Sequence, residues 1–421
     1  MDFNVSGFCQ GCYFYFMANL LYMREMDKMP ATTFAANPEL RINLERFEIL
    51  DALIDGFIQK EYKQFFVVRA HRFGVPVYEH CAGENTKPYG LTQDSITPVF
   101  SCTKPITAVL IMKLQEDGLL DVCDPVVSYL PWMGEGKEGI QIWHLLTHTS
   151  GIIDEDFFKH CENMCEKYFG LKEPEHGAGD EAWKEYGNKV KEKAGLSADA
   201  SRDEVDHYFL ARFTPTKAPH EIMSYGMTGF NLLGDIITAV TGKTLEEYAR
   251  EVLFSPLGMT NSHFIVPKDK YDQVIGRKEG MQGVPWINSE SCMNNMHAQN
   301  GLKTTVVDLC RFGDMVLAQG EIDGKIYLSP ASIREMSDNH NADLDGFWNS
   351  WGLGWNVRGK KKDDAGILRS ATSLEHGGWA GAKMICDPVY DLSLAIFSGE
   401  PDPVPKYCLN NIINVIYSAM R

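Results

Sequence analysis

The tetrapeptide Ser101-Cys102-Thr103-Lys104 places a hydroxyl and an amine three residues apart, directly before the apolar run 106–114. If a helix begins here, this spacing brings both side chains onto one helix face. A serine hydroxyl is a weak nucleophile, and a lysine can accept its proton once burial lowers the pKa of the amine. Free N–H groups at a helix start also attract an oxyanion. The spacing therefore indicates a nucleophile with a built-in base.

The motif alone leaves a second interpretation open, because a capped helix with an exposed lysine has the same pattern. Pro105 disfavours the α conformation at Lys104, so we expect an irregular first turn. Two segments farther along the chain, 224–229 (SYGMTG) and 375–379 (EHGGW), favour the catalytic interpretation. They supply a phenol and a glycine-rich edge in a fixed order after the serine.

Together these three segments resemble the serine β-lactamase-like superfamily, in particular the branch with class C β-lactamases, family VIII carboxylesterases and D-aminopeptidases. The resemblance runs from about residue 45 to the C-terminus. Further segments fit the same pattern: 142–151 (IWHLLTHTSG), 256–259 (PLGM), 300–305 (NGLKTT) with Asp308, and 352–355 (GLGW). Independent short motifs in one order rarely coincide by chance.

The resemblance implies an acyl-enzyme mechanism for three residues. Ser101 would attack the carbonyl carbon and become acylated. Lys104 and the phenol of Tyr225 would move its proton, the tyrosine acting as a phenolate or through the lysine. A buried core tyrosine is the competing interpretation of Tyr225.

The resemblance also implies an oxyanion hole and a substrate edge. The backbone N–H groups of Ser101 and Trp379 would bind the oxyanion. His376 lies on the same edge; the alternative is that it is only a structural residue in a turn. Gly377 and Gly378 would keep this strand clear of side chains so that substrate can approach.

Two positions depart from the pattern of the relatives that process β-lactams. His376 stands where those enzymes usually carry the lysine of Lys-Thr-Gly, and Met227 stands where they carry the asparagine of Tyr-x-Asn. Histidine is mostly neutral at pH 7 and a thioether is a weak acceptor, so recognition of a carboxylate and an amide is weakened. We therefore expect an uncharged, more apolar substrate.

Aromatic residues near the third motif are candidates for the wall of a substrate pocket. We assign Met227, Trp351 and Trp355 to this pocket, and burial in the core is the alternative for the tryptophans. The other aromatic candidates are Phe347, Trp348 and Trp379.

These assignments predict a serine hydrolase, a carboxylesterase acting on small neutral esters without metal or organic cofactor. A D-amino-acid amidase or peptidase, a weak β-lactamase and an acyltransferase are alternatives within the enzyme class. A non-catalytic scaffold with the same fold is the alternative outside it. The sequence does not indicate the oligomeric state.

Composition excludes other classes of function. The 421 residues include 40 Lys and Arg against 57 Asp and Glu, a formal net charge of −17. Without a basic cluster, such a chain repels nucleic acid. The apolar stretch 13–23 is too short to cross a membrane and a poor signal peptide. We expect no firm membrane association.

Cysteines and histidines give no persuasive metal site. The eleven cysteines are scattered, and the pairs Cys9/Cys12 and Cys161/Cys165 lack a second pair at zinc spacing. His144 and His148 have the spacing of zinc ligands but no glutamate after the first histidine. An odd number of cysteines in a large chain favours a reducing compartment, so we expect a cytoplasmic protein, with an atypical export signal as the alternative.

The elements that must position these residues are predicted from hydrophobic periodicity. Apolar residues at 47–58 recur every three or four positions and predict a helix, followed by a hairpin at 65–78. A second hairpin at 383–397 and a helix at 407–420 close the chain. We therefore predict an α/β protein of the α+β type, with an antiparallel sheet from both chain ends flanked by helices.

Two further segments complete the predicted organisation. Residues 154–213 are charged and helix-prone and predict an all-helical subdomain, either a solvated face or a lid over the cleft. The nucleophile is expected at the junction of sheet and subdomain. Residues 1–43 form an extension of unknown role before a catalytic domain at 44–421.

Overall fold

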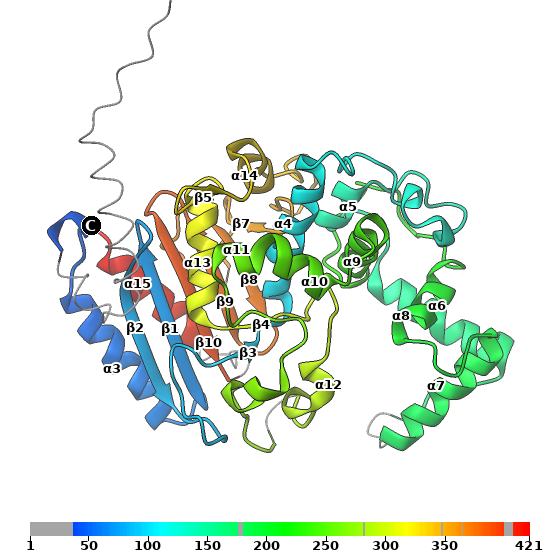
Figure 1. Ribbon diagram of the computed structural model, residues 1–421, viewed down its shortest axis with the longest axis horizontal. Coiled ribbons are helices and arrows are strands. Elements are labelled where there is room, and N and C mark those ends of the chain that lie inside the picture. Colours follow the sequence, from blue (N-terminus) through cyan, green and yellow to red (C-terminus); the bar gives the residue numbers. More distant parts are fainter. Residues whose placement is uncertain (1–36, 176–179, 281–282, 347, 364, 400–406) are drawn as a thin grey trace, which may run out of the picture.

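The structure is a computed structural model that describes residues 37–175, 180–280, 283–346, 348–363, 365–399 and 407–421. An antiparallel sheet, six-stranded within these residues, has the order β2-β1-β10-β9-β8-β7 (Figure 1). The strands are β1 (Phe65–Arg72), β2 (Val75–Gly83), β7 (Asn356–Val357), β8 (Leu374–Gly378), β9 (Ala382–Asp387) and β10 (Leu392–Ser398).

The sheet joins the two ends of the chain, as predicted. β1 pairs with β10, so that Val68 lies opposite Ile396 and Ala70 lies opposite Leu394. The β1–β2 and β9–β10 hairpins confirm the two predicted hairpins. All eight residues of β1 are buried because helices cover both faces of the sheet.

Two helices from opposite chain ends cover one face of the sheet. α3 (Glu45–Gln59) and α15 (Cys408–Ala419) pack against each other beside β1 and β2 (Figure 1). Leu50, Ile54, Ile412 and Ile416 are fully buried in one apolar cluster. Full burial of such a side chain stabilises the fold by about 1.5–3 kcal/mol. Both predicted terminal helices are therefore confirmed.

The other face carries the helices that reach the candidate site. α13 (Val306–Leu317) packs across β1, β9 and β10, and α4 (Thr103–Glu116) packs against α9 (Thr228–Thr241). α4 is buried almost all round, including Thr107 and Lys104. A helix that is buried on nearly every side is held by its neighbours, which fixes the residues at its start.

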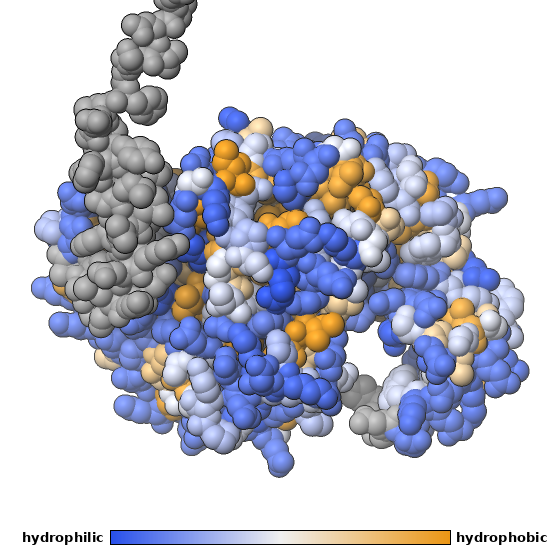
Figure 2. Space-filling view, in the orientation of Figure 1, coloured by the Kyte–Doolittle hydropathy of each residue, from blue (hydrophilic) through white to orange (hydrophobic). Residues whose placement is uncertain are grey.

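The regular elements in the described part of segment 154–213 are helices. They are α6 (Asp154–Met164), the π-helical turn η5 (Cys165–Phe169), α7 (Asp180–Ala194) and α8 (Arg202–Leu210). Phe157, Phe209 and Phe213 join the main apolar core, and α7, at the edge of the molecule in Figure 1, contributes Val190 to the same core. A gap is visible between α7 and the body of the molecule (Figure 2). Residues 176–179 of this segment lie outside the described residues.

Shorter elements connect these parts. Within the described residues, no helix is long and apolar enough to span a membrane; segment 13–23 lies outside them. The remaining elements are η1 (Pro38–Leu40), β3 (Thr97–Pro98), η2 (Phe100–Cys102), η3 (Val126–Ser128), η4 (Pro131–Met133), α5 (Ile142–Leu146), α10 (Leu245–Ala249), η6 (Arg250–Phe254), α11 (Ser255–Leu257), η7 (Lys268–Gln273), η8 (Trp286–Asn288), α12 (Glu290–Met293), β4 (Lys303–Thr304), β5 (Glu321–Ile322), β6 (Lys325–Ile326) and α14 (Pro330–Ser337).

Candidate active site

Ser101 and Lys104 lie together where the 3₁₀ turn η2 leads into α4. Lys104 Nζ donates a hydrogen bond to Ser101 Oγ at 3.2 Å and another to the Gln299 carbonyl oxygen at 3.1 Å. The predicted irregular turn is present, because η2 covers residues 100–102 and α4 begins only at Thr103. Phe100, just before the serine, has a positive φ of 47°, a strained conformation often found beside functional residues.

Burial makes the amine of Lys104 a weak base. The side chain is fully buried, and desolvation lowers its pKa to about 7, although the negative charge of Asp154 opposes the shift. The amine also lies 4.9 Å from the ring centroid of Tyr225 and 5.4 Å from that of Phe230. An amine with this pKa is uncharged in a large fraction of molecules near neutral pH and can accept a proton.

Tyr225 faces the same pair of residues. Its hydroxyl is hydrogen-bonded to Ser101, while 45% of the residue surface is exposed towards the cleft. Desolvation raises the pKa of the phenol above its usual value, so that Tyr225 is protonated at neutral pH. Of the two routes expected for the proton, this pKa favours the one through Lys104 over a phenolate.

The glycine-rich end of β8 lies directly against η2. A side chain at Gly378 would come within 2.1 Å of the Val99 carbonyl oxygen, so only glycine allows this approach. Cys102 Sγ donates a hydrogen bond to the His376 carbonyl oxygen at 3.2 Å. Trp379 follows β8 and packs edge-on against Phe100 at 5.4 Å. The strand edge expected to face substrate is thereby brought next to the serine.

His376 is buried and neutral. Burial and the nearby charge of Lys104 lower its pKa to about 3. Its Nδ1 lies 3.1 Å from the Gly377 carbonyl oxygen, which can only accept, so this nitrogen carries the proton. The side chain that replaces the lysine of the β-lactam-processing relatives therefore adds no positive charge.

Ser101 opens into a cleft of about 670 Å³ with an aromatic wall. Of the expected pocket residues, Trp351 lines this cleft. Trp355 does not, because it is fully buried and stacks on Phe312 with a centroid distance of 6.2 Å. Phe347 lies outside the described residues. The aromatic residues of the wall are Tyr225, Trp348, Trp351, Trp379 and Tyr407.

Met227 was expected in this pocket and lies elsewhere. It is 39% exposed and lines a second groove of about 700 Å³ between α8 and α9. Met227 follows Tyr225 by two residues in the chain. It is the N-cap residue of α9, where the backbone has already turned towards the helix. The assignment of Met227 to the pocket beside Ser101 is therefore wrong.

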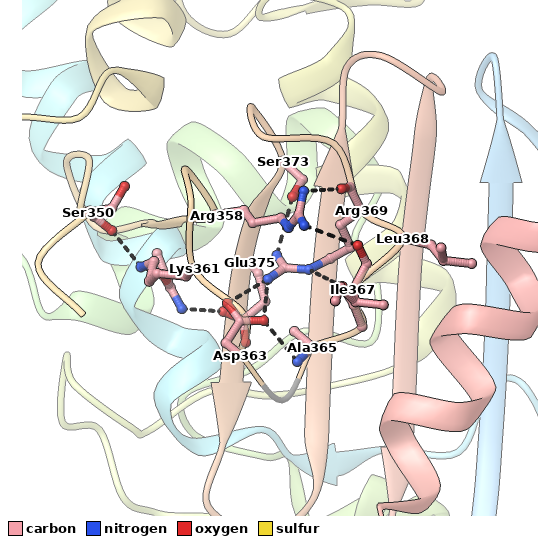
Figure 3. Close-up of polar contacts among 12 residues, drawn as sticks. Ser350, Arg358, Lys361, Asp363, Ala365, Ile367, Leu368, Arg369, Ser373 and Glu375 are labelled. Atoms are coloured by element: carbon pink, nitrogen blue, oxygen red, sulfur yellow. Dashed lines mark hydrogen bonds and ion pairs between the residues drawn. The ribbon is translucent and has the colours of Figure 1, made fainter. Parts of the chain in front are cut away.

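A polar network in the lining of the cleft, of which Figure 3 labels Lys361 and Glu375, was not predicted from the sequence. Lys383 Nζ forms an ion pair with Glu375 at 2.6 Å, and Glu375 also accepts from Asn356 Nδ2 at 2.7 Å. Lys361 donates to Asn356 and to the Ser350 carbonyl oxygen. No motif marks this network, because its members come from loops and from the three strands β7, β8 and β9, which meet only in the folded chain. Only the alternation along β8 and β9 could have indicated that Glu375 and Lys383 share a face.

The two histidines with zinc-like spacing have other partners. His144 Nδ1 accepts from the Gln141 N–H at 2.9 Å, and His148 Nδ1 accepts from the Gly226 N–H at 3.2 Å. Across the described parts of the chain, no three histidine, cysteine or acidic side chains form a group suited to a metal ion. The Cys161/Cys165 pair consists of free thiols, and Cys9 and Cys12 lie outside the described residues.

Comparison with known proteins now gives the family. The profile described as "Beta-lactamase" matches residues 67–415. The chain belongs to the beta-lactamase family. Members of this family are serine hydrolases, among them esterases, peptidases and β-lactamases, which act on small-molecule esters or amides.

Individual members of the beta-lactamase family are only distantly similar to this chain. A putative D-alanyl-D-alanine carboxypeptidase from Escherichia coli K12 is 22% identical over 416 residues, covering 89% of this chain and 87% of the relative. The solved structure of EstCE1, a hydrolase with promiscuous acyltransferase activity, has a TM-score of 0.65 at 18% identity and covers 88% and 98% of the two chains. A family VIII carboxylesterase has a TM-score of 0.64 at 15% identity, covering 89% and 98%. These structures confirm the predicted fold.

Proposed function

We propose that this protein is a carboxylesterase that hydrolyses small neutral esters through an acyl-enzyme on Ser101. The observation that carries the proposal is the 3.2 Å contact between Lys104 Nζ and Ser101 Oγ, made by a buried amine with a pKa of about 7. This contact joins a nucleophile to a base that is partly unprotonated at neutral pH.

Acylation follows from this arrangement. Ser101 Oγ attacks the ester carbonyl carbon while Lys104 accepts the serine proton, and the Tyr225 hydroxyl helps to move it. The backbone N–H groups of Ser101 and Trp379 stabilise the negative charge on the carbonyl oxygen. Removal of one such donor typically slows a reaction by about a hundredfold to a thousandfold. The tetrahedral intermediate then collapses, and the alcohol leaves with a proton from the Lys104–Tyr225 pair.

Deacylation uses the same groups in reverse. Lys104 and Tyr225 deprotonate a water molecule, which attacks the acyl carbon, and the proton returns to Ser101 Oγ. An alcohol that enters instead of water would take the acyl group. Acyltransfer is therefore the second candidate reaction, supported by the similarity to EstCE1, a hydrolase with promiscuous acyltransferase activity.

The charge states of His376 and Lys383, at the glycine-rich edge of the cleft, support a neutral substrate; the amine of Lys361, which also lines the cleft, donates to the Ser350 and Asn356 oxygens. His376 is uncharged, and Lys383 is neutralised by its ion pair with Glu375 at 2.6 Å. The aromatic wall with Trp351 and Trp379 suits an apolar acyl or aryl group. A carboxylate-bearing lactam or D-alanyl peptide would find no unpaired cation at His376.

An amidase, a peptidase or a weak β-lactamase is the nearest alternative. It is supported by the similarity to the putative D-alanyl-D-alanine carboxypeptidase. An ester is the easier substrate, because an alcohol leaves more readily than an amine, which must first be protonated. The hydrogen bond between Lys104 and Ser101 argues against a non-catalytic scaffold.

The wider organisation of the chain is part of the same proposal. We place the catalytic domain at 44–421, with its helical insertion at 154–213 and an extension at 1–43. Free thiols within the described residues, among them Cys102, Cys161 and Cys310, support a reducing, cytoplasmic setting.

A substrate panel tests the proposed function. Purified protein is assayed with short p-nitrophenyl esters, with D-alanyl amides and with nitrocefin, each with and without an added alcohol as acyl acceptor. We expect the highest kcat/KM for the esters and a mass increase of one acyl group on wild-type protein but not on Ser101→Ala. Faster turnover of nitrocefin or of the amides would replace the esterase with the alternative.

A further inference from the structure

We propose that His148 and Asp154 form a clamp that positions Tyr225 for proton transfer, with His148 acting only as a neutral residue. This inference rests on the proposed role of Tyr225 in the serine hydrolase mechanism. It adds two positioning residues that lie outside the Ser-x-x-Lys, Tyr and His-Gly-Gly motifs.

The clamp holds the backbone on both sides of Tyr225. His148 accepts from the Ser224 N–H with its carbonyl oxygen at 2.8 Å and from the Gly226 N–H with Nδ1 at 3.2 Å. Its ring also packs on the Tyr225 ring with a centroid distance of 4.5 Å. One residue thereby fixes the residue before the phenol, the phenol ring and the residue after it.

Asp154 holds the next part of the same segment. Its carboxylate accepts from the Met227 N–H at 2.6 Å and from the Thr228 N–H at 3.2 Å, which caps the start of α9. A side chain at Gly226 would come within 3.0 Å of this carboxyl group, so the glycine allows the close approach. Since α6 begins at Asp154, the first helix of the insertion is tied directly to the segment that carries Tyr225.

The backbone conformation of His148 indicates that the residue has a positioning role. His148 has a positive φ of 59°, which costs free energy for a residue other than glycine. The residue is only 6% exposed, and its Nε2 has no hydrogen-bond partner among the residues that the structure describes. A buried donor without a partner costs about 1–3 kcal/mol. A residue kept under both costs has a role beyond filling space.

The charge state of His148 matters because a cation lies close by. The groups that face it are Lys104 on α4, His376 on β8, and Tyr225 and Trp351, whose rings it contacts. Burial and the positive charge of Lys104 hold the pKa of His148 well below its usual value. Nδ1 accepts from an N–H and therefore carries no proton. A second positive charge would compete with Lys104 for the role of the proton carrier, and the neutral ring avoids this.

Two substitutions separate the parts of the clamp. His148→Asn tolerates the positive φ and places an amide oxygen near the position of Nδ1, so it retains the Gly226 contact but loses the ring. His148→Phe retains an aromatic ring but removes the acceptor for the Gly226 N–H. His144→Asn is the matched control, because His144 lies one helical turn earlier and caps the Gln141 N–H instead.

Each variant is made in the wild-type and the Tyr225→Phe backgrounds, and kcat, KM and the pH profile are measured with a p-nitrophenyl ester. In the wild-type background we expect His148→Phe to lower kcat by about 10- to 100-fold with KM nearly unchanged, and His148→Asn to remain within about tenfold of wild type. In the Tyr225→Phe background both effects should shrink to less than about threefold. The acid limb of the profile should keep its position, because His148 carries no proton in the mechanism.

Three results would overturn the clamp. The first is an equal loss in both backgrounds, which would mean that His148 acts independently of Tyr225. The second is an equal loss in His144→Asn, which would mean a general effect on stability, and melting temperatures of all variants report this directly. The third is a shift of the acid limb in His148→Asn, which would make His148 a proton carrier. Turnover retained in Ser101→Ala would instead contradict the proposed function itself.

Discussion

Two lysines in different regions of the molecule, Lys104 at the start of α4 and Lys303 in β4, have nearly the same electrostatic environment. Both are buried, and desolvation lowers the pKa of each amine to about 7. Their hydrogen-bond partners differ. Lys303 donates to the carbonyl oxygens of Phe264 and Asn295, both at 2.7 Å, whereas Lys104 reaches Ser101 Oγ at 3.2 Å.

The comparison separates a perturbed pKa from a catalytic role. Carbonyl oxygens can only accept hydrogen bonds, so Lys303 has no proton to take from its two partners and serves to join two loops. Lys104 contacts a hydroxyl that opens into a cleft. A lowered lysine pKa thus marks a functional residue only where a nucleophile lies within reach.

The largest expected effect is the loss of that nucleophile. Ser101→Ala should abolish covalent labelling by a fluorophosphonate and lower kcat by at least about a thousandfold, because no acyl-enzyme can form. Cys102→Ala is the control, since Cys102 is buried and donates to the His376 carbonyl oxygen. Labelling that persists in Ser101→Ala and disappears in Cys102→Ala would show that Cys102, and not Ser101, is the nucleophile.

The second prediction tests the comparison itself. Lys104→Ala and Tyr225→Phe should each lower kcat by about a hundredfold or more, and the double variant should be little worse than the more severe single one, because the two residues act as one proton-transfer unit. Lys303→Met should lower the melting temperature, since two carbonyl oxygens lose their partner, but leave kcat within about threefold.

Additive losses at Lys104 and Tyr225 would contradict a shared role. A large fall of kcat in a folded Lys303→Met protein would show that the low pKa, and not the contact with serine, identifies the functional lysine. Steady-state kinetics and melting curves on the same samples distinguish these results.

The third prediction concerns pH. Lys104 acts as a base only when unprotonated, so activity should fall as the pH decreases through its pKa of about 7.

The negative charge of Asp154 raises the pKa of Lys104. Asp154→Asn should therefore lower it and move the acid limb of kcat/KM to lower pH, while the maximal rate falls because one clamp acceptor is lost. Asp156→Asn, on the same turn of α6, should leave the limb in place. A limb that moves to higher pH, or does not move, would exclude Lys104 as the titrating base.

The fold was predictable where periodicity is strong. The apolar spacing at 47–58 and the alternation in the two hairpins depend only on local sequence. The observed helix α3 and the pairing of β1 with β10 confirm the predicted sheet from both chain ends. The Ser101–Lys104 contact was also predictable, because it spans a single helical turn. These features need no knowledge of distant contacts.

The rest of the site depends on contacts between distant segments. The four hydrogen bonds from the backbone of 224–228 to His148 and Asp154 join residues that are 73 to 78 positions apart in the chain. The ion pair of Glu375 with Lys383 lies beside a loop that carries no motif. Trp355 and Met227 were misplaced for a related reason. Position in the chain shows which residues follow a motif, but not which face of the backbone points into the cleft.

The smallest expected effect concerns substrate choice at His376, which lines the same cleft as Ser101. His376 lies in the cleft and is neutral, whereas Met227 lines a separate groove. His376→Lys should therefore raise the activity towards a carboxylate-bearing lactam, relative to a neutral ester, by roughly tenfold, about the value of one charge-assisted hydrogen bond. Met227→Asn alone should leave this ratio unchanged, and it serves as the matched control.

The new amine at position 376 would also lie near Lys104, whose charge already lowers the pKa of His376. The ratio is therefore compared at pH 8, where most of Lys104 is neutral. An unchanged ratio in a folded His376→Lys protein would show that the aromatic wall, and not the charge at this position, selects the substrate.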